Sequence, residues 1–229
     1  MKKMISIFLI GLCLPASLAA SMHIRCDLTS RYIWRGFDLN PDNRPALQPS
    51  ITLGFGDTGL FLDIWSSISF EAKERGEIDL TLFYDFMISE DVSLVAGFTH
   101  YGFYFQNGFS WRRNTTQEFY LSGGLPSIFL SPAVSLFYDI NRGSGFYGRV
   151  AGELPLRLSR KVRPLLSAAL GYNRRLFIPD EGWSDLDLGL TLPLRFDRIE
   201  IAPYIFYTFV FLDSVNPEDE FRAGIAVMF

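Results

Sequence analysis

Hydrolysis by a serine nucleophile needs a histidine that activates the serine and an Asn or Asp that orients the histidine. The sequence has only two histidines, His23 and His100. His100 lies in "FTHYGF", and the next serine along the chain is Ser110. This spacing is not a catalytic pattern, so the sequence predicts no enzyme. A lipid-modifying enzyme that uses His100 and Ser110 is the weakest alternative.

Charged side chains recur at every second position of many segments, with apolar side chains between them. Arg31 and Arg35 could hold an anionic group, or they could pair with carboxylates. Asp185 and Asp187 could hold a divalent cation, but paired or solvated carboxylates explain them as well, and we expect neither a metal site nor a cofactor. By this alternation the candidate residues of one shared polar face are Arg25, Arg31, Arg35, Asp63, Asp79, Asp85, Glu118, Arg149, Glu153, Asp185, Asp187, Glu200 and Arg222.

Almost the whole sequence alternates with a period of two residues, which is typical of β-strands with one polar and one apolar face. The pattern is clearest in "EIDLTLFYDFMI" (77–88) and "SDLDLGLTLPL" (184–194). We count about 12 strands of roughly 9 to 12 residues, the length that a tilted strand needs to cross a bilayer. Short turns such as "GDTG" (56–59) alternate with longer, more charged connections such as "FDLNPDNRPA" (37–46). A membrane barrel with periplasmic termini shows this rhythm.

The N-terminus has the features of a secretory signal. Lys2 and Lys3 precede the apolar run "MISIFLIGLCLP", and "SLAAS" offers small residues for cleavage. We therefore predict a cleavable signal peptide over residues 1–20. Loss of Lys2 and Lys3 from the 21 basic residues leaves 19 against 25 acidic ones, a net charge of −6. An acidic exported chain is a poor candidate for binding nucleic acid.

The alternation fits either a soluble β-sandwich or a membrane barrel. Uninterrupted apolar faces and aromatic residues near strand ends favour the barrel. The last segment, "EFRAGIAVMF", has Phe221, Ile225, Val227 and Phe229 on one apolar face. A closed barrel pairs its last strand with its first, so that every backbone group is satisfied in lipid. We predict an all-β fold, a single 12-stranded antiparallel transmembrane β-barrel over 21–229, with both termini in the periplasm.

Two segments resemble known outer-membrane proteins. The closing strand, which ends in Phe229, resembles the C-terminal assembly signal of Gram-negative outer-membrane proteins, and this implies recognition by the barrel assembly machinery. The segment "SRYIWRGFDLNPDNRPALQPSITLGF" (30–55) resembles the opening of a porin family of uncertain function, the TorF or Gcw_chp type. The shared features are an aromatic-Arg-Gly step, a polar loop and a "Gln-x-Ser" strand. This resemblance implies a barrel that could form a pore, and it supplies no substrate.

The polar face then lines the interior of the barrel, and two functions remain open. About eight strands leave room only for side chains, whereas about 16 leave an aqueous channel. The first alternative is a narrow passive pore of the outer membrane for small hydrophilic solutes, which the excess of acids makes cation-preferring. The second is a closed barrel that binds partners through its extracellular loops, of which 101–116 is the best candidate for a lid. The expected partners are outer-membrane lipid, the barrel assembly machinery and small solutes.

Overall fold

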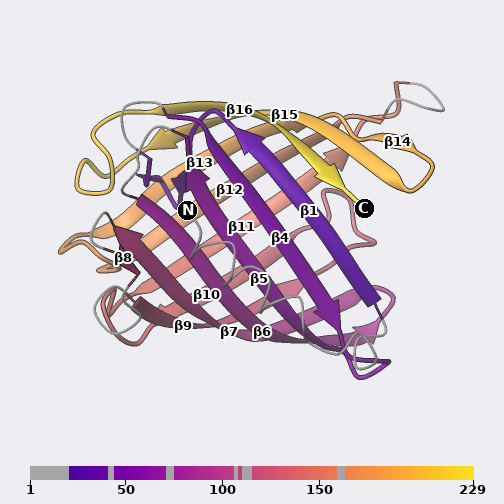
Figure 1. Cartoon of the computed structure of the whole chain (residues 1–229), viewed down its shortest axis with the longest axis horizontal. Coiled ribbons are helices and arrows are strands. Elements are labelled where there is room, and N and C mark those ends of the chain that lie inside the picture. The colour runs from indigo at the N-terminus through magenta and orange to yellow at the C-terminus, as the bar shows by residue number, and fades with distance from the viewer. Residues whose placement is uncertain (1–20, 41–43, 71–74, 106–107, 110–114, 159–162) are drawn as a thin grey trace.

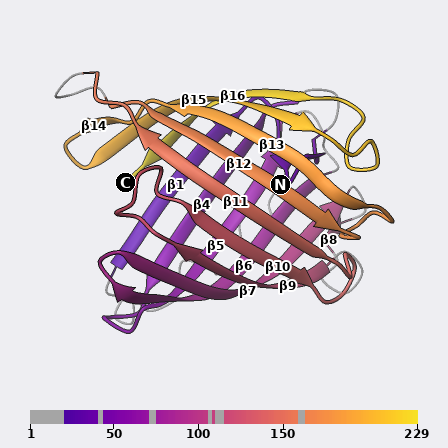
Figure 2. The ribbon, with the colours of Figure 1, turned by 180° about the vertical axis from the view of Figure 1, so that it is seen from behind.

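The computed structural model describes residues 21–40, 44–70, 75–105, 108–109, 115–158 and 163–229. These residues form a closed antiparallel barrel of 12 strands (Figure 1), and the same ring is seen from behind in Figure 2. Each strand pairs with its neighbours in sequence, and the last strand returns to the first. The predicted fold is confirmed. Residues 1–20, for which we predict a signal peptide, lie outside the described residues.

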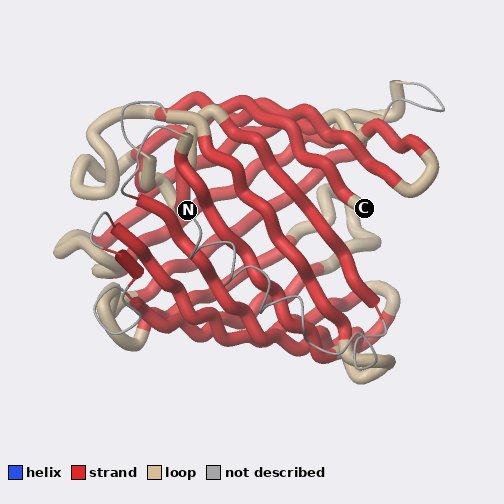
Figure 3. The backbone as a smooth tube through the Cα atoms, in the orientation of Figure 1, coloured by secondary structure: helices blue, strands red, loops and turns tan. Residues whose placement is uncertain are grey.

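The wall of the barrel contains strands of 7 to 15 residues. They are β1 (Ser21–Thr29), β4 (Ala46–Gly54), β5 (Leu60–Ser69), β6 (Arg75–Ser89), β7 (Val92–Phe105), β9 (Thr115–Gly124), β10 (Ala133–Asp139), β11 (Phe146–Pro155), β12 (Leu165–Arg174), β13 (Glu181–Thr191), β15 (Ile199–Val210) and β16 (Glu220–Met228). Outside this ring, β2 (Ile33–Trp34) pairs with β3 (Phe37–Asp38), β8 (Gly108–Phe109) with β7, and β14 (Leu194–Phe196) with β15. The connections gather at the two ends of the barrel (Figure 3). No helix among the described residues is long and apolar enough to cross a membrane.

The first and last strands close the barrel. Arg25 lies opposite Met228 in this seam. The backbone N–H of Phe229 donates a 3.0 Å hydrogen bond to the carbonyl of Ile24, so the last residue is held in the wall. Without this seam, both edges would leave unpaired backbone groups in hydrocarbon. We call the end of the barrel where β1 begins and β16 ends the termini end, and the opposite end the loop end.

The apolar face of the wall points outward. Leu188 is 43% exposed, Phe119 is 53% exposed and Ile225 is 45% exposed, whereas Asp185 and Glu118 on the other face are 2% and 1% exposed. A soluble sandwich would show the reverse pattern, with the apolar face buried. The exposed aliphatic and aromatic side chains form the surface that acyl chains cover, so the chain is a β-barrel of the bacterial outer membrane.

A charge on this outer face is expected to be costly. Leu188 lies in the middle of β13 and points to lipid, so Leu188→Arg should lower the free energy of unfolding in vesicles by about 2 to 4 kcal/mol. Leu158, in the turn after β11, is 70% exposed and lies outside the strands. Leu158→Arg is the control and should change stability little. Equal effects at the two positions would contradict the outward orientation.

The structure corrects two element boundaries. The alternation predicts that the first strand continues through Arg35, but β1 ends at Thr29 and the following residues fold inward. The connection predicted over 101–116 is shorter, because β7 continues beside β6 to Phe105 and β9 begins at Thr115. Residues 106–107 and 110–114 of this predicted lid lie outside the described residues.

Candidate functional site

The connection between β1 and β4 folds into the barrel as a hairpin, residues 30–40, which we call the inner hairpin. Trp34 of β2 lies opposite Phe37 of β3, and Arg35 and Gly36 form the turn between them. Their φ angles are +54° and +82°, as a type I′ turn requires. An arginine in this conformation costs about 1 to 3 kcal/mol, so contacts around the turn must hold it in place.

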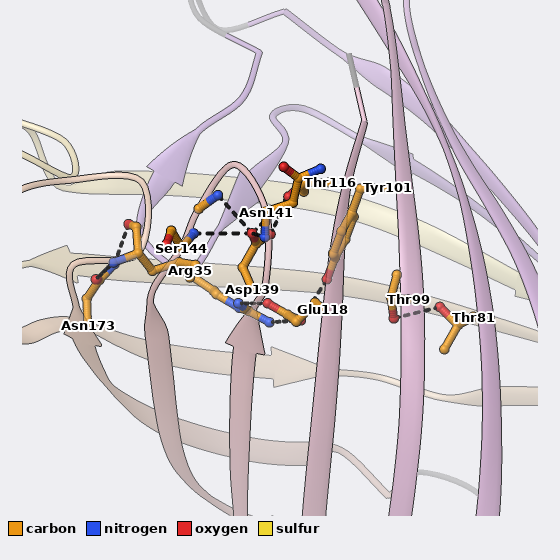
Figure 4. Close-up of polar contacts among 12 residues, drawn as sticks. Arg35, Thr81, Thr99, Tyr101, Thr116, Glu118, Asp139, Asn141, Ser144 and Asn173 are labelled. Carbon is orange, nitrogen blue, oxygen red and sulfur yellow. Dashed lines mark hydrogen bonds and ion pairs between the residues drawn. The ribbon is translucent and has the colours of Figure 1, made fainter. Parts of the chain in front are cut away.

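The side chain of Arg35 reaches β9. Its two terminal nitrogens donate hydrogen bonds of 2.6 and 2.8 Å to the carboxylate of Glu118, and the phenol of Tyr101 donates a third of 2.9 Å (Figure 4). The side chains of Arg35 and Glu118 are only 8% and 1% exposed, so this is a buried bidentate ion pair. Burial alone lowers the pKa of Arg35, but the hydrogen bonds and charge of Glu118 outweigh it and raise that pKa. The guanidinium therefore stays charged.

Aromatic rings enclose the same guanidinium. Its central carbon lies 4.1 Å from the ring centre of Phe137, 4.3 Å from that of Trp34 and 4.7 Å from that of Tyr147. A desolvated cation–π contact contributes roughly 2 kcal/mol. Phe137 and Tyr147 belong to β10 and β11, so Arg35 links the inner hairpin to three neighbouring strands of the wall, β9, β10 and β11.

The base of the inner hairpin is tied to β16. Arg31 forms an ion pair with Glu220. Arg222 donates a 2.8 Å hydrogen bond to the backbone carbonyl of Ile33. These contacts hold the hairpin at β16, across the barrel from Glu118. Arg31 and Arg222 are both residues of the predicted polar face.

Packing fixes the rest of the hairpin. The rings of Tyr32 and Trp65 have centres 5.4 Å apart, which joins the hairpin to β5. A Cβ atom at Gly36 would lie 2.9 Å from Val215 and 3.2 Å from Asp185 of β13, so the turn fits closely against that wall. Since the hairpin contacts strands on all sides of the ring, it lies across the lumen.

A carboxylate also organises the neighbouring connection at the loop end. Asp139 accepts hydrogen bonds from the Thr116 hydroxyl and from the backbone N–H groups of Asn141, Gly143 and Ser144 (Figure 4). Asp139 is completely buried. Charge-assisted hydrogen bonds of this number fix the 140–145 connection, so Asp139 has a structural role.

On the termini side of the inner hairpin lies a cavity of about 480 Å³. Its wall comes mainly from β1, β15 and β16, and Arg31 and Tyr32 of the hairpin face it. Arg25 donates two hydrogen bonds of 2.6 and 2.8 Å to Asp27 within it. The charged residues of the cavity are Arg25, Asp27, Arg31, Glu153, Glu200 and Arg222. Acids and arginines are balanced here, so this cavity alone gives no preference for one sign of charge.

The β5–β6 wall is different, because three of its carboxylates have no basic partner among the described residues. Asp63 accepts a hydrogen bond from Thr52. One oxygen each of Asp79 and Asp85 is buried without a hydrogen-bond partner. Within the part of the chain that the structure describes, no Lys or Arg forms an ion pair with these three aspartates. This side of the lumen is therefore lined by acidic side chains.

Of the remaining predicted residues, Asp185, Asp187 and Glu200 have local partners. Asp187 accepts a hydrogen bond from Thr208 and lies 3.7 Å from Arg222. Arg195 donates a 2.6 Å hydrogen bond to Glu200. Asp185 accepts a 3.0 Å hydrogen bond from Tyr147, while Arg149 and Glu153 follow Tyr147 on the same face of β11. The prediction missed Glu77, Tyr101 and Glu220, although Glu77 and Glu220 lie two residues from Asp79 and Arg222 and share their faces.

Catalytic and metal-binding alternatives gain no support from this geometry. Thr99 and Tyr101 face the interior, so His100 between them points outward, where its Nδ1 lies 3.1 Å from the amide nitrogen of Gln117. Ser110 lies outside the described residues. Among the residues described, no three His, Cys, Asp or Glu side chains gather as a metal site.

Comparisons with known proteins place this barrel in a family. The family described as "Bacterial protein of unknown function (Gcw_chp)" matches residues 16–196. The chain belongs to this family. The matched segment includes the inner hairpin and extends from β1 to β14, and it agrees with the resemblance seen in residues 30–55. No curated protein matches the chain.

Three solved structures with a similar fold are two porins and one outer membrane channel. The KdgM porin has a TM-score of 0.61 at 13% identity, covering 90% of this chain and 98% of its own. The NanC porin has a TM-score of 0.54 at 13% identity, covering 91% and 99%. The COG4313 outer membrane channel from Pseudomonas putida F1 has a TM-score of 0.50 at 10% identity, covering 93% and 98%. At such identities the likeness establishes the barrel fold of this Gcw_chp protein and leaves its function open.

Proposed function

We propose that the chain is a narrow passive channel for small hydrophilic solutes, with the inner hairpin as its constriction. The observation that carries the proposal is the polar lumen, which opens into a cavity of about 480 Å³ beside the hairpin. The names of the KdgM and NanC porins support the same reading. Solutes would pass between the hairpin and the wall by diffusion, without a cofactor.

We further propose how the barrel is oriented in the outer membrane. The termini end, with its short turns, would face the periplasm, and the loop end would face outward. Residues 1–20 would be removed during export, and the closing strand that ends in Phe229 would be recognised by the barrel assembly machinery. His100 would have no catalytic role.

The test is the conductance of the mature chain, residues 21–229, in a planar lipid bilayer. We expect small, discrete current steps. Silence at every voltage, both for this chain and for a variant without the inner hairpin, would remove the channel proposal.

One observation favours the second candidate, a closed barrel that binds partners through its loops. The inner hairpin contacts strands on all sides of the lumen, with Arg35 and Glu118 almost completely buried. If the mature chain is silent and only the variant without the hairpin conducts, the closed barrel is the correct reading.

Within the channel proposal, the β5–β6 wall would favour cations. The triple variant Asp63→Asn, Asp79→Asn, Asp85→Asn removes the carboxylates that lack a basic partner. The ratio of cation to anion permeability, measured from the reversal potential across a salt gradient, should fall toward one. Asp57→Asn, in an exposed turn, is the control and should leave the ratio unchanged. An unchanged ratio in the triple variant would show that this wall does not set selectivity.

A further inference from the structure

We propose that the loop end binds a small organic ammonium cation in an aromatic box formed by Trp34, Phe37, Tyr101, Phe103 and Phe177. The box borders a cavity of about 240 Å³ that Glu77 also lines. The proposal rests on the channel function, because it names a class of solute that reaches the outer mouth. Its components come from three elements: the inner hairpin, β7 and the connection after β12.

Three ring pairs of the box meet at steep angles, while the rings of Trp34 and Phe37 lie 6.1 Å apart at 30°. The ring centres of Trp34 and Tyr101 are 6.0 Å apart at 70°, and those of Trp34 and Phe177 are 6.0 Å apart at 64°. Phe37 and Phe177 lie 6.5 Å apart at 87°. Rings in this arrangement surround a shared space with several orientations of their π-systems. The negative faces of aromatic rings attract cations, and quaternary ammonium groups are bound in aromatic cages of this kind.

Two buried carboxyl groups lie beside the box. Glu77 and Asp79 are hydrogen-bonded to each other and are only 5% and 7% exposed. Glu77 lines the cavity, and Asp79 follows it on the same face of β6. One oxygen of Asp79 has no hydrogen-bond partner, and no ion pair reaches either group within the described part of the chain. The charged form of a buried carboxyl group is costly, and a bound cation would stabilise that form.

Tyr32 of the inner hairpin supports this charge. Its phenol is hydrogen-bonded to Glu77. Burial, followed by the charges of Glu77 and Asp79, raises the pKa of Tyr32 well above its usual range. The phenol therefore keeps its proton and acts as a hydrogen-bond donor. It orients the carboxylate, but it adds no positive charge.

The other polar groups of the box are already used. The Tyr101 hydroxyl donates to Glu118, and the Thr116 hydroxyl donates to Asp139. Among the described residues that line the cavity, Glu77 is the acidic group that can face a ligand. A sugar would bury several hydroxyl groups without partners, and a neutral apolar molecule would leave the carboxylate uncompensated. An ammonium ion with an apolar surface satisfies both the rings and the charge.

The nearby guanidinium of Arg35 does not oppose such a ligand. It lies over Trp34, but both carboxylate oxygens of Glu118 accept its hydrogen bonds. Its charge is therefore matched within its own cluster, and Glu77 and Asp79 decide the net charge beside the box.

Phe177 is a second, independent sign of a binding site. Its φ is +61°, which is a strained conformation for an aromatic residue. The strain is not compensated by burial, because the side chain is 41% exposed. The preceding Leu176 is fully buried and exchanges two hydrogen bonds with Asn173, so the chain holds Phe177 in place. Strained residues that are held in this way are concentrated at ligand sites.

Calorimetric titration tests the proposal on the folded mature chain in octyl glucoside, a detergent without an ammonium group. The probe is choline, and the matched neutral probe is 3,3-dimethylbutan-1-ol, which has the same shape without the charge. We expect choline to bind and the alcohol to bind weaker by about tenfold or more. Glu77→Gln should weaken choline binding by about tenfold or more and leave the alcohol unchanged.

A second variant keeps the test valid if Glu77→Gln fails to fold. Phe177→Leu retains an apolar side chain but removes the ring, and it should also weaken choline binding. Phe129→Ala, in an exposed turn at the termini end, should not. Equal affinity for the two probes, no choline binding by the folded chain, or unchanged binding in Phe177→Leu would overturn the proposal. None of these outcomes alters the conductance, so the channel proposal is tested separately.

Discussion

Arg35→Ala is expected to destabilise the barrel by about 3 to 5 kcal/mol, because it leaves the carboxylate of Glu118 buried without a cation. Glu118 is 1% exposed and, among the described side chains, would keep the hydrogen bond from Tyr101 alone. The three cation–π contacts would be lost as well. The measurement is the free energy of unfolding in urea, followed by tryptophan fluorescence with the barrel in lipid vesicles.

The control is an ion pair of the same chemistry on the surface. Arg195 bonds to Glu200 at 2.6 Å, but its side chain is 85% exposed. Arg195→Ala should therefore change stability by about 1 kcal/mol or less. The double variant Arg35→Met, Glu118→Leu removes both buried charges and should recover much of the loss. If Arg35→Ala costs no more than Arg195→Ala, the buried pair does not hold the inner hairpin.

Removal of the inner hairpin is expected to increase conductance severalfold. Thr29 lies opposite Ala46 in the β1–β4 pair, so a turn of four Gly and Asn residues can replace residues 31–44 without changing the register. The lumen would then lose the element that lies across it, and a 12-stranded wall without this element has room for water. The measurement is single-channel current in a planar bilayer.

A matched replacement at the other end separates this effect from a general loosening of the barrel. Gly124 lies opposite Ala133, so the same four-residue turn can replace residues 125–132. We expect this variant to conduct like the unmodified chain. Equal conductance of all three barrels would mean that the inner hairpin is not the constriction.

The barrel itself could be predicted from the sequence, because lipid and lumen impose opposite chemistry on alternate residues of each strand. In β13, the run from Asp185 to Leu190 shows this directly: Asp185 is buried, whereas Leu188 and Leu190 are exposed. The apolar closing strand predicted a seam, and its pairing with β1 is confirmed. These features depend only on local alternation, which a single sequence contains.

The inner hairpin could not be predicted from the same signal. Its two short strands also alternate, so residues 30–35 look like a continuation of β1. What places them in the lumen is a set of contacts distant in sequence, such as Arg35 with Glu118, which are 83 residues apart. Alternation assigns a side chain to a face, but it does not identify its partner. The aromatic box could not be predicted for the same reason, since Trp34, Tyr101 and Phe177 meet only in the folded chain.

The central claim is that solutes cross the barrel through the lumen beside the inner hairpin. Its most direct test is the single-channel current of two cysteine variants during reaction with a charged methanethiosulfonate reagent, in a background with Cys26→Ser. Gln48 lines the cavity of about 480 Å³, whereas the preceding residue of β4, Leu47, points to lipid. We predict that the reagent reduces the current of Gln48→Cys and does not affect Leu47→Cys. An unchanged current in Gln48→Cys, or an equal reduction in both, would contradict the account.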